Sequence, residues 1–368
     1  MRKLINKLLL ISALMITCTS VLAQTIKIGV AASLSGANRS VGYQQWQGVD
    51  LAVQIINQNG GINGNKIELI DGDDRCDPDE AIKVAKRLVQ NKVTAVIGHT
   101  CSGATLAAQK IYNDANIVMI TPSSTDPNIT NQGLKLVFRT CGTNDMQADV
   151  AANFITKELS PKKIAIVYVN IPYASTLGEL AKKSLEKHDA NIVLFQAIEQ
   201  RQWNFDKLLQ EIKEKDPDVI YFAGMYQEAG RFLRKLREQR IMGTFVSGDG
   251  IATSNFVQAA GGPYMVKGVY MTFFEPAKSS QASDVMSKFE ENRIKPDGFT
   301  LNAYAAMQAL AQAIKQSGSF EGKKIGQWLH SHDVQSVIGD LQWNEKGDLK
   351  NAPFAIYQWN DDGEYERY

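Results

Sequence analysis

The sequence lacks an excess of charge of either sign, and it lacks a long apolar run after residue 23. Its 40 Lys and Arg side chains are balanced by 39 Asp and Glu side chains, and the formal net charge is +1. A nucleic-acid or anionic-membrane partner would need a basic excess, so the balance argues against both. A membrane-spanning helix needs roughly 20 consecutive apolar residues, so we expect none in the remainder of the chain.

Histidine and cysteine are scarce, with four of each, and this restricts the hypotheses for enzymes and metal sites. His330 and His332 have no further ligand at metal-binding spacing, which favours surface residues over a metal site. His99 and Cys101 would have to fold back on each other to act as base and nucleophile. Neither the Gly-x-Gly-x-x-Gly nor the Gly-x4-Gly-Lys-Ser/Thr nucleotide motif occurs. We therefore expect no catalytic residue, metal or cofactor.

The first residues have the composition of an export signal. A positive n-region precedes a short apolar core at residues 8–16 and small residues at 21–23, which predicts cleavage after Ala23 and a periplasmic mature protein. A retained anchor is one alternative, but the apolar core is too short to span a bilayer. A lipidated Cys18 is the other, although Thr17 is larger than the residue that lipoprotein processing favours there.

Three cysteines follow the predicted signal: Cys76, Cys101 and Cys141. In an oxidising periplasm two of them can pair, which leaves one over. Spacing alone allows three pairings.

Short runs rich in Ile and Val alternate with segments of helical periodicity along most of the chain. We predict strands at residues 25–32, 66–71, 94–98, 117–121, 163–169, 192–197, 219–223 and 244–247. We predict helices at residues 43–57, 78–90, 103–114, 145–159, 174–187, 205–215 and 227–240. Runs without polar alternation, such as 164–167, are typical of parallel strands that are covered on both faces. The pattern therefore predicts an α/β fold of parallel sheets with right-handed crossovers.

The alternation has two breaks, at residues 140–144 and near 268–276. The helical segments 281–292 and 302–316 that follow the second break have no strand series of their own. We therefore expect them to pack on the first domain. One large doubly wound domain is the alternative, but the length of the chain favours two lobes.

In open parallel sheets the ligand crevice lies beyond the carboxyl ends of the strands. The first strand series ends in hydroxyl groups and backbone amides, and the second ends in aromatic rings and one carboxylate. The first-series segments are 33–36, 98–103 and 121–125, and the second-series segments are 170–173, 224–226 and 248–250. The two predicted lobes thus offer different chemistry to a ligand between them.

This difference predicts a ligand that carries both charges. Ser102 lies where a helix begins, and its hydroxyl and the free N–H groups there can hold a carboxylate. Ser123 and Thr125 add charge-assisted hydrogen bonds. Asp249, between two glycines, is positioned to pair with an ammonium group. The alternative makes Ser102 an ordinary N-cap, Thr125 a turn residue and Asp249 a solvated turn acid, but their shared position at strand ends favours an α-amino acid site.

Several segments resemble the leucine/isoleucine/valine-binding proteins of bacterial ABC transport. They are AASLSG (31–36), GGING (60–64), DDRCDP (73–78), GHTCS (98–102), TPSST (121–125), YAA (304–306) and NEKGD (344–348). The resemblance implies a type I periplasmic-binding fold, with two doubly wound parallel-sheet lobes, three crossovers and hinge closure. It implies a signal peptide at 1–23, a first lobe of 24–143 plus 272–350, and a second lobe of 144–271 plus 351–368.

The resemblance also assigns the binding residues. It implies Ser102, Ser123 and Thr125 for the ligand carboxylate, and Tyr173 and Asp249 for the ammonium. Relatives carry glutamate where this chain has Asp249, so the ammonium must lie nearer or a water must bridge.

The implied pocket for the ligand side chain consists of Val41, Thr100, Met225 and Phe299. Relatives selective for branched aliphatic ligands carry tyrosine, leucine, tyrosine and phenylalanine there, and only the phenylalanine is kept. The identity of the amino acid therefore stays open. Trp46 and Tyr226 either fill part of the vacated space or are ordinary aromatic residues of a helix and a loop.

The resemblance further implies a disulfide between Cys76 and Cys101, and it leaves Cys141 as a buried free thiol. It implies a monomeric solute-binding protein, not an enzyme. Such a protein delivers an amino acid, branched-chain or similarly apolar, to an inner-membrane ABC permease. The alternative is a ligand-sensing module of the same fold for an amino acid or a small amide. An export signal without a later membrane segment favours the transport receptor.

Overall fold

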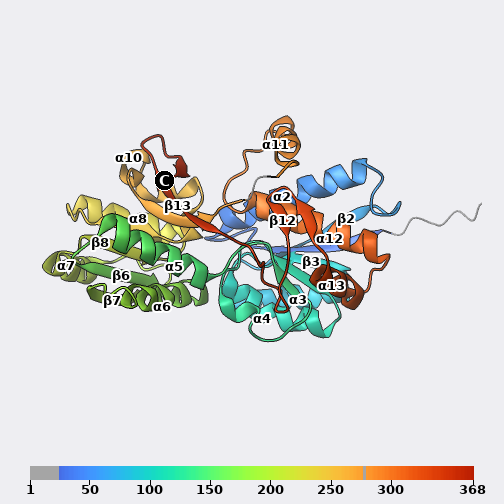
Figure 1. The fold of residues 1–368 in the computed structure, drawn as a ribbon, viewed down its shortest axis with the longest axis horizontal. Coiled ribbons are helices and arrows are strands. Elements are labelled where there is room, and N and C mark those ends of the chain that lie inside the picture. Colours follow the sequence, from blue (N-terminus) through green and yellow to red (C-terminus); the bar gives the residue numbers. More distant parts are fainter. Residues whose placement is uncertain (1–24, 277–278) are drawn as a thin grey trace, which may run out of the picture.

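The computed structural model describes residues 25–276 and 279–368, which form two lobes side by side (Figure 1). The predicted signal peptide lies outside the described residues. Each lobe has a central sheet with helices on both faces, so the predicted α/β class is confirmed. None of the described helices combines the length and the apolar character that a bilayer crossing requires.

The sheet of the first lobe has five strands in the order β2-β1-β3-β4-β5, and every pair in it is parallel. Its strands are β1 (Ile26–Ala32), β2 (Ile67–Asp73), β3 (Ala95–Gly98), β4 (Val118–Thr121) and β5 (Val137–Arg139). The helices between them are α2 (Arg39–Gln58), α3 (Pro78–Gln90) and α4 (Ser102–Asp114). The four longer strands match predicted ones, and β5, with three residues, was not predicted.

The sheet of the second lobe has seven strands in the order β14-β13-β10-β9-β8-β6-β7. Its parallel strands are β6 (Ile164–Val169), β7 (Ile192–Ile198), β8 (Val219–Ala223), β9 (Thr244–Ser247) and β10 (Tyr270–Phe274). Strands β13 (Phe354–Trp359) and β14 (Tyr365–Arg367) pair antiparallel at one edge, so this sheet is mixed. A last pair, β11 (Val334–Ser336) and β12 (Gly339–Leu341), stands apart from both sheets.

The helices of the second lobe follow the predicted segments closely. They are α5 (Asn144–Phe154), which continues as a π-helical turn (Ile155–Leu159), α6 (Pro172–Glu186), α7 (Asp206–Lys215), α8 (Tyr226–Glu238), α9 (Asn255–Ala260) and α10 (Pro263–Val266). The short helices α9 and α10 were not predicted. They lie between β9 and β10 in the chain.

The chain passes between the sheets three times, after β5, after β10 and before β13. The expected lobe boundary after residue 271 falls inside strand β10, which runs to Phe274. We therefore propose that the second passage begins after Phe274.

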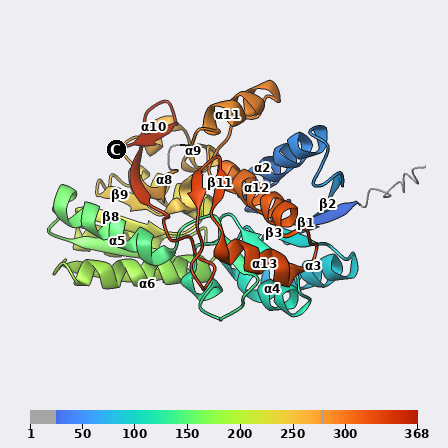
Figure 2. The same ribbon diagram turned by 45° about the vertical axis from the view of Figure 1, so that its right-hand side comes forward.

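The late helices pack on the first lobe, as predicted for the segments 281–292 and 302–316, and the third of these helices was not predicted. They are α11 (Ala282–Glu291), α12 (Thr300–Ser317) and α13 (Gly322–Ser331), and Figure 2 shows α12 beside α2. Gly48 of α2 permits this approach, since a Cβ atom there would lie 2.2 Å from the Thr300 carbonyl oxygen. Phe289 and Leu310 belong to the same buried apolar cluster as Ile28 of β1. The first lobe therefore consists of two separate stretches of the chain.

Candidate functional site

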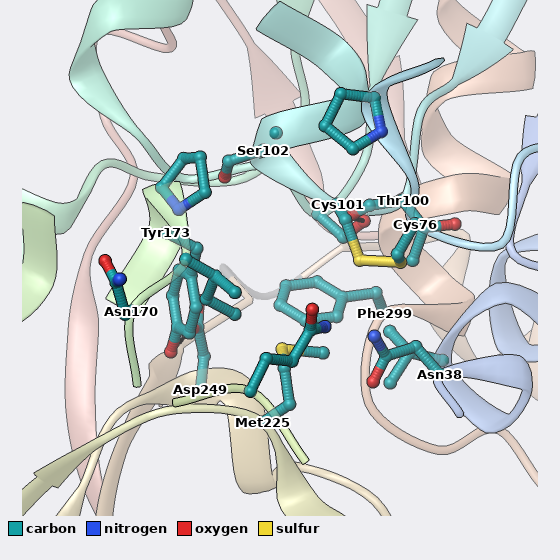
Figure 3. A pocket seen from close by; sticks show the side chains of 17 residues that line it. Asn38, Cys76, Thr100, Cys101, Ser102, Asn170, Tyr173, Met225, Asp249 and Phe299 are labelled. Atoms are coloured by element: carbon teal, nitrogen blue, oxygen red, sulfur yellow. Dashed lines mark hydrogen bonds between the residues drawn. A yellow bond between two sulfur atoms is a disulfide. The ribbon is translucent and has the colours of Figure 1, made fainter. Parts of the chain in front are cut away.

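A cavity of about 220 Å³ lies between the two lobes, at the carboxyl ends of the strands of both sheets. Eight of the nine residues predicted to bind a ligand line it: Val41, Thr100, Ser102, Ser123, Tyr173, Met225, Asp249 and Phe299. Figure 3 shows Ser102 and Thr100 on one side of this space, with Asp249 and Met225 on the opposite side. The structure thus brings together residues that lie far apart in the sequence.

The first-lobe side of the cavity is built on the N-terminus of α4. Ser102 is the first helical residue, and the N-cap residue Cys101 makes no side-chain capping bond. The first N–H group to bond within the helix is that of Thr105, 3.0 Å from the Cys101 carbonyl oxygen. The N–H groups at residues 102–104 therefore have no helical acceptor, and they favour a negative group at this end.

The hydroxyl groups at this end differ in their availability. Ser102 Oγ accepts a hydrogen bond of 3.4 Å from the Asp126 N–H group, so its own proton stays free for a ligand. Ser123 Oγ donates to the Thr100 carbonyl oxygen at 2.9 Å, so its proton is engaged. Ser102 is thus the better placed donor of the two.

Thr125 is the one predicted residue that does not line the cavity. It is fully buried, and its Oγ1 atom has no hydrogen-bond partner among the described residues. Its carbonyl oxygen accepts a bond of 2.8 Å from the Asn144 N–H group, where the chain enters the second lobe. Its neighbour Asp126 contacts Ser102. A direct contact between Thr125 and a ligand stays a prediction.

The second-lobe side presents a carboxyl group that is held in place by neutral partners. Tyr173 donates its hydroxyl proton to Asp249 Oδ1 at 2.7 Å, and the Gly250 N–H group donates to the Tyr173 oxygen at 3.0 Å. The Asp249 N–H group donates to Gln147 Oε1 at 3.1 Å. Asp249 Oδ2 is buried without a partner among the described residues. One carboxylate oxygen is thus fixed, and the other is unused.

The glycines beside Asp249 allow this close packing. A Cβ atom at Gly248 would lie 2.9 Å from the Tyr173 hydroxyl oxygen, and one at Gly250 would lie 2.2 Å from the Gly224 carbonyl oxygen. Asp249 itself is only 4% exposed. The alternative that Asp249 is a solvated turn residue is therefore wrong.

The electrostatics of the second-lobe side follow from burial. Desolvation raises the pKa of Asp249 to about 6, against the opposing hydrogen bond from Tyr173. Burial and the nearby Asp249 raise the pKa of Tyr173, so Tyr173 keeps its proton and donates it. No ion pair reaches Asp249 within residues 25–276 and 279–368. A cation from outside the chain would supply the missing partner.

Between these two ends the lining is largely apolar. Val41, Met225 and Phe299 are buried, and the Phe299 ring packs edge-to-face on Phe273 with centroids 5.3 Å apart. The Thr100 hydroxyl group donates to Gln45 Oε1 at 3.0 Å, so its proton is already used. This part of the cavity can surround an aliphatic group.

The structure places neither Trp46 nor Tyr226 in the lining. Trp46 donates its indole N–H to Asp71 at 3.0 Å and stacks on Tyr43. Tyr226 donates its hydroxyl proton to the carbonyl oxygen of Ala37 at 2.8 Å. The hypothesis that these rings fill the vacated space is therefore wrong.

Asn38 and Gln147 are among the residues of the site that were not predicted from the sequence. Asn38, which precedes α2, lines the cavity, and Gln147 on α5 fixes the backbone of Asp249. Thr272 Oγ1 donates to the same Gln147 oxygen at 2.8 Å. Gln147 lies within a helix, 102 residues from Asp249, and no local pattern marks such a contact. Asn38 lies one turn before Val41, and an asparagine at such a position is typical of an ordinary helix cap.

The disulfide between Cys76 and Cys101 is present, with a Cα–Cα distance of 5.3 Å, and this confirms the expected pairing. Both cysteines line the cavity, as Figure 3 shows. Cys141 is a buried free thiol, as expected, and burial raises its pKa to about 12. The bond ties the loop after β2 to the N-terminus of α4.

His99 makes structural contacts. His99 is buried, with Nδ1 at 2.6 Å from Asp74 Oδ2 and Nε2 at 3.1 Å from the Tyr112 hydroxyl oxygen. Because the disulfide occupies the Cys101 sulfur, a thiol nucleophile with His99 as its base is not formed. Over the described ranges, no cluster of three or more His, Cys, Asp or Glu side chains could hold a metal ion.

Hydrogen bonds between the lobes close the cavity at its rim. Tyr226 and Gln227 Nε2 both donate to the Ala37 carbonyl oxygen, at 2.8 and 2.6 Å. The Ser40 and Thr253 hydroxyl oxygens lie 2.8 Å apart, and further along the cleft Thr176 Oγ1 donates to Asp126 Oδ2 at 3.0 Å. The two lobes are thus in contact on both sides of the cavity.

The family model for periplasmic binding proteins matches residues 25–364. The chain is 40% identical over 361 residues to an amino acid binding protein of Pseudomonas aeruginosa, covering 98% of this chain and 96% of that protein. It is 34% identical over 346 residues to the Leu/Ile/Val-binding protein of Escherichia coli, with 93% of each covered.

Among solved structures, the chain matches the branched-chain amino acid transporter substrate binding protein LivJ of Streptococcus pneumoniae in complex with isoleucine. The TM-score is 0.84 at 28% sequence identity, and the match covers 93% of this chain and 98% of that one. The family model matches nearly the whole described chain, and two relatives exceed 30% identity. The fold of two lobes with a cavity between them agrees with these matches. The chain belongs to the periplasmic binding protein family.

Proposed function

We propose that the protein binds one α-amino acid as its zwitterion between the two lobes and delivers it to an inner-membrane ABC permease. The names of the relatives support the ligand class, since they describe an amino acid binding protein and a Leu/Ile/Val-binding protein. The isoleucine complex of LivJ supports it as well.

The observation that carries the proposal is the unpaired oxygen of Asp249. A buried carboxylate without a cation is unfavourable, and an ammonium group from a ligand supplies the partner. Across the cavity, Ser102 and the first N–H groups of α4 favour a negative group. An α-amino acid carries both an ammonium group and a carboxylate group as substituents of one carbon atom.

The ligand side chain then lies against Val41, Met225 and Phe299. These residues favour an aliphatic body, as in the branched-chain amino acids or a similarly apolar ligand. A cavity of about 220 Å³ is smaller than the roughly 300–1,000 Å³ of pockets for drug-sized ligands, which favours a single amino acid over a peptide.

The remaining parts of the proposal concern the setting of the protein. We propose export with cleavage after Ala23, action in the periplasm as a monomer, and a binding role without catalysis. The family description and the relatives support a periplasmic binding protein. N-terminal sequencing of the mature protein checks the cleavage site.

The test is calorimetric titration of refolded, ligand-stripped protein with each of the 20 common amino acids. We expect saturable binding with one site for at least one of them. Heat exchange with none of the 20 would overturn the proposal. Titration with the matching amino acid amide, which lacks the carboxylate, controls for binding that does not require this charged group.

A further inference from the structure

Asn38 is a buried polar residue in the cavity that the binding of a zwitterion does not use. It is only 4% exposed, and its side chain makes no hydrogen bond to any described residue. In Figure 3 its amide points from the first-lobe side into the cavity, near Phe299 and away from Tyr173 and Asp249. Its amide atoms open into the cavity and pair with no described residue, so a ligand group in the cavity can become their partner.

The position of Asn38 in the chain makes its free side chain more informative. It is the N-cap residue of α2, where an asparagine side chain commonly accepts a hydrogen bond from the first turn of the helix. Here only its backbone carbonyl oxygen serves α2, at 3.1 Å from the Val41 N–H group, and the side chain makes no capping bond. The amide thus faces the cavity and does not cap α2.

The charges of the lining restrict what the amide can bind. Of the described residues that line the cavity, none is Lys, Arg or His, and Asp249 is the one carboxylate. An acidic ligand side chain would therefore lack a cation, and a basic one would compete with the α-ammonium for Asp249. The group opposite Asn38 is thus neutral.

An amide carries one acceptor oxygen and two N–H donors, so it can pair with a hydroxyl or with another carboxamide. Val41 and Phe299 line the same cavity and offer an apolar surface to a ligand. We infer that the ligand is an amino acid whose side chain joins an apolar stem to a neutral hydrogen-bonding group, and that Asn38 selects this group. The inference rests on the proposed function and narrows its ligand class.

The test compares side chains of nearly equal shape that differ in polarity: threonine with valine, asparagine with leucine, and glutamine with methionine. A wholly apolar pocket would favour the second member of each pair, whereas a site with an unpaired amide favours the first. We expect ligand-stripped protein to bind the polar member at least about tenfold more tightly in one or more pairs. Tighter binding of the apolar member in all three pairs would overturn the inference.

The variant Asn38→Leu keeps the size of the side chain and removes its hydrogen-bonding groups. We expect it to weaken binding of the preferred polar ligand by about tenfold or more and to leave the apolar member of the pair within a few-fold. An unchanged ratio between the two ligands would contradict the assignment. Asn292→Leu, at an exposed helix end that does not line the cavity, is the matched control.

The two proposals fail in different ways. If none of the 20 amino acids binds, the proposed function is wrong. If amino acids bind but the apolar member binds more tightly in all three pairs, only the inference about Asn38 is wrong. Should Asn38→Leu not fold by circular dichroism, the ranking of ligands by the unaltered protein still decides the question.

Discussion

At the scale of single residues, Asp249 combines two properties that seldom occur together: its carboxyl group is buried, and it has no cation near it. Tyr173 donates a hydrogen bond to one carboxylate oxygen, and Gln147 accepts one from the backbone N–H group of Asp249, yet the other carboxylate oxygen has no partner among the described residues. Desolvation outweighs these bonds and raises the pKa to about 6. The residue is thus unfavourable in the empty protein and favourable once an ammonium group occupies the cavity.

We expect Asp249→Asn to weaken binding of the best amino acid by about 3–5 kcal/mol, because the ammonium would be buried without its charged partner. Ser102→Ala should weaken binding less, by about 1–3 kcal/mol, since the N–H groups of α4 still serve the carboxylate. Titration calorimetry of both variants measures this order. Asp189→Asn, at an exposed position, controls for charge alone, and a silent Asp249→Asn would remove Asp249 from the site.

Ligand affinity should also depend on pH. Because the pKa of Asp249 in the empty protein is raised to about 6, the free carboxyl group is protonated below that pH and must lose its proton before an ammonium binds. We expect constant affinity above about pH 7 and roughly tenfold weaker binding for each pH unit below 6. Tyr173 and Tyr221, which face Asp249, keep their protons because burial raises the pKa of both. Asp249→Asn should remove the dependence.

The same raised pKa also makes the stability of the ligand-free protein depend on pH. Stability should rise as the pH falls, whereas ligand affinity should fall. The folded state holds the Asp249 proton more tightly than the unfolded state, so this stabilisation is present below about pH 4 and is lost as the pH rises through 6. Near neutral pH the ligand-free Asp249→Asn protein should therefore unfold at a higher urea concentration than the unaltered protein. Equal urea midpoints of the two proteins at pH 7 would argue against a carboxylate that burial destabilises.

At the scale of elements, the N-terminus of α4 depends on a covalent link. The Cys76–Cys101 bond joins the loop after β2 to the residue before Ser102, across 25 positions of the chain. His99 and Asp74 support the same two loops through a buried hydrogen bond of 2.6 Å. The first-lobe end of the site is thus fixed from both β2 and β3.

We expect the double variant Cys76→Ser/Cys101→Ser to lower the free energy of unfolding by about 2–4 kcal/mol, since its unfolded chain is less restricted. Urea unfolding under oxidising conditions measures this. Cys141→Ala, which removes the buried free thiol, is the control for the loss of a cysteine. Peptide mapping without reductant should link Cys76 to Cys101, and a bridge that contains Cys141 would contradict the structure.

Much of the framework was predictable at this scale because parallel strands buried on both faces form continuous apolar runs. The eight predicted strands all occur, from β1 to β9 with β5 excepted. Strands β13 and β14 pair antiparallel outside the strand-helix-strand repeat, and β5 has only three residues, so neither periodicity nor length marks them. The strand-end rule found Ser102, Tyr173 and Asp249, which follow closely on a strand, whereas it missed Gln147, which lies inside α5 and not directly after a strand.

At the scale of the whole molecule, the lobes hold each other through polar contacts at the rim of the cavity. Two donors, Tyr226 and Gln227, share the Ala37 carbonyl oxygen, and the Ser40 hydroxyl oxygen lies 2.6 Å from Asn255 Nδ2. These bonds join side chains that water can also satisfy, so each adds about 0.5–1.5 kcal/mol. A ligand that bonds to both lobes adds to them and favours the closed state.

We expect the radius of gyration from X-ray scattering to fall when the best amino acid is added to ligand-stripped protein, because the lobes close on it. Asp249→Asn at the same ligand concentration should show a smaller change, since fewer molecules are occupied. An unchanged radius at saturation of the unaltered protein would count against closure by a hinge.

The central claim, that Asp249 pairs with the ligand ammonium inside the closed cavity, is tested most directly by changing both partners. The affinity of the best amino acid and of its α-hydroxy analogue is measured for the unaltered protein and for Asp249→Asn. We predict that losing the ammonium weakens binding to the unaltered protein several hundredfold or more and weakens binding to Asp249→Asn only slightly, because the pair is already broken there. Equal losses for both proteins would show that Asp249 and the ammonium do not interact, and would contradict the account.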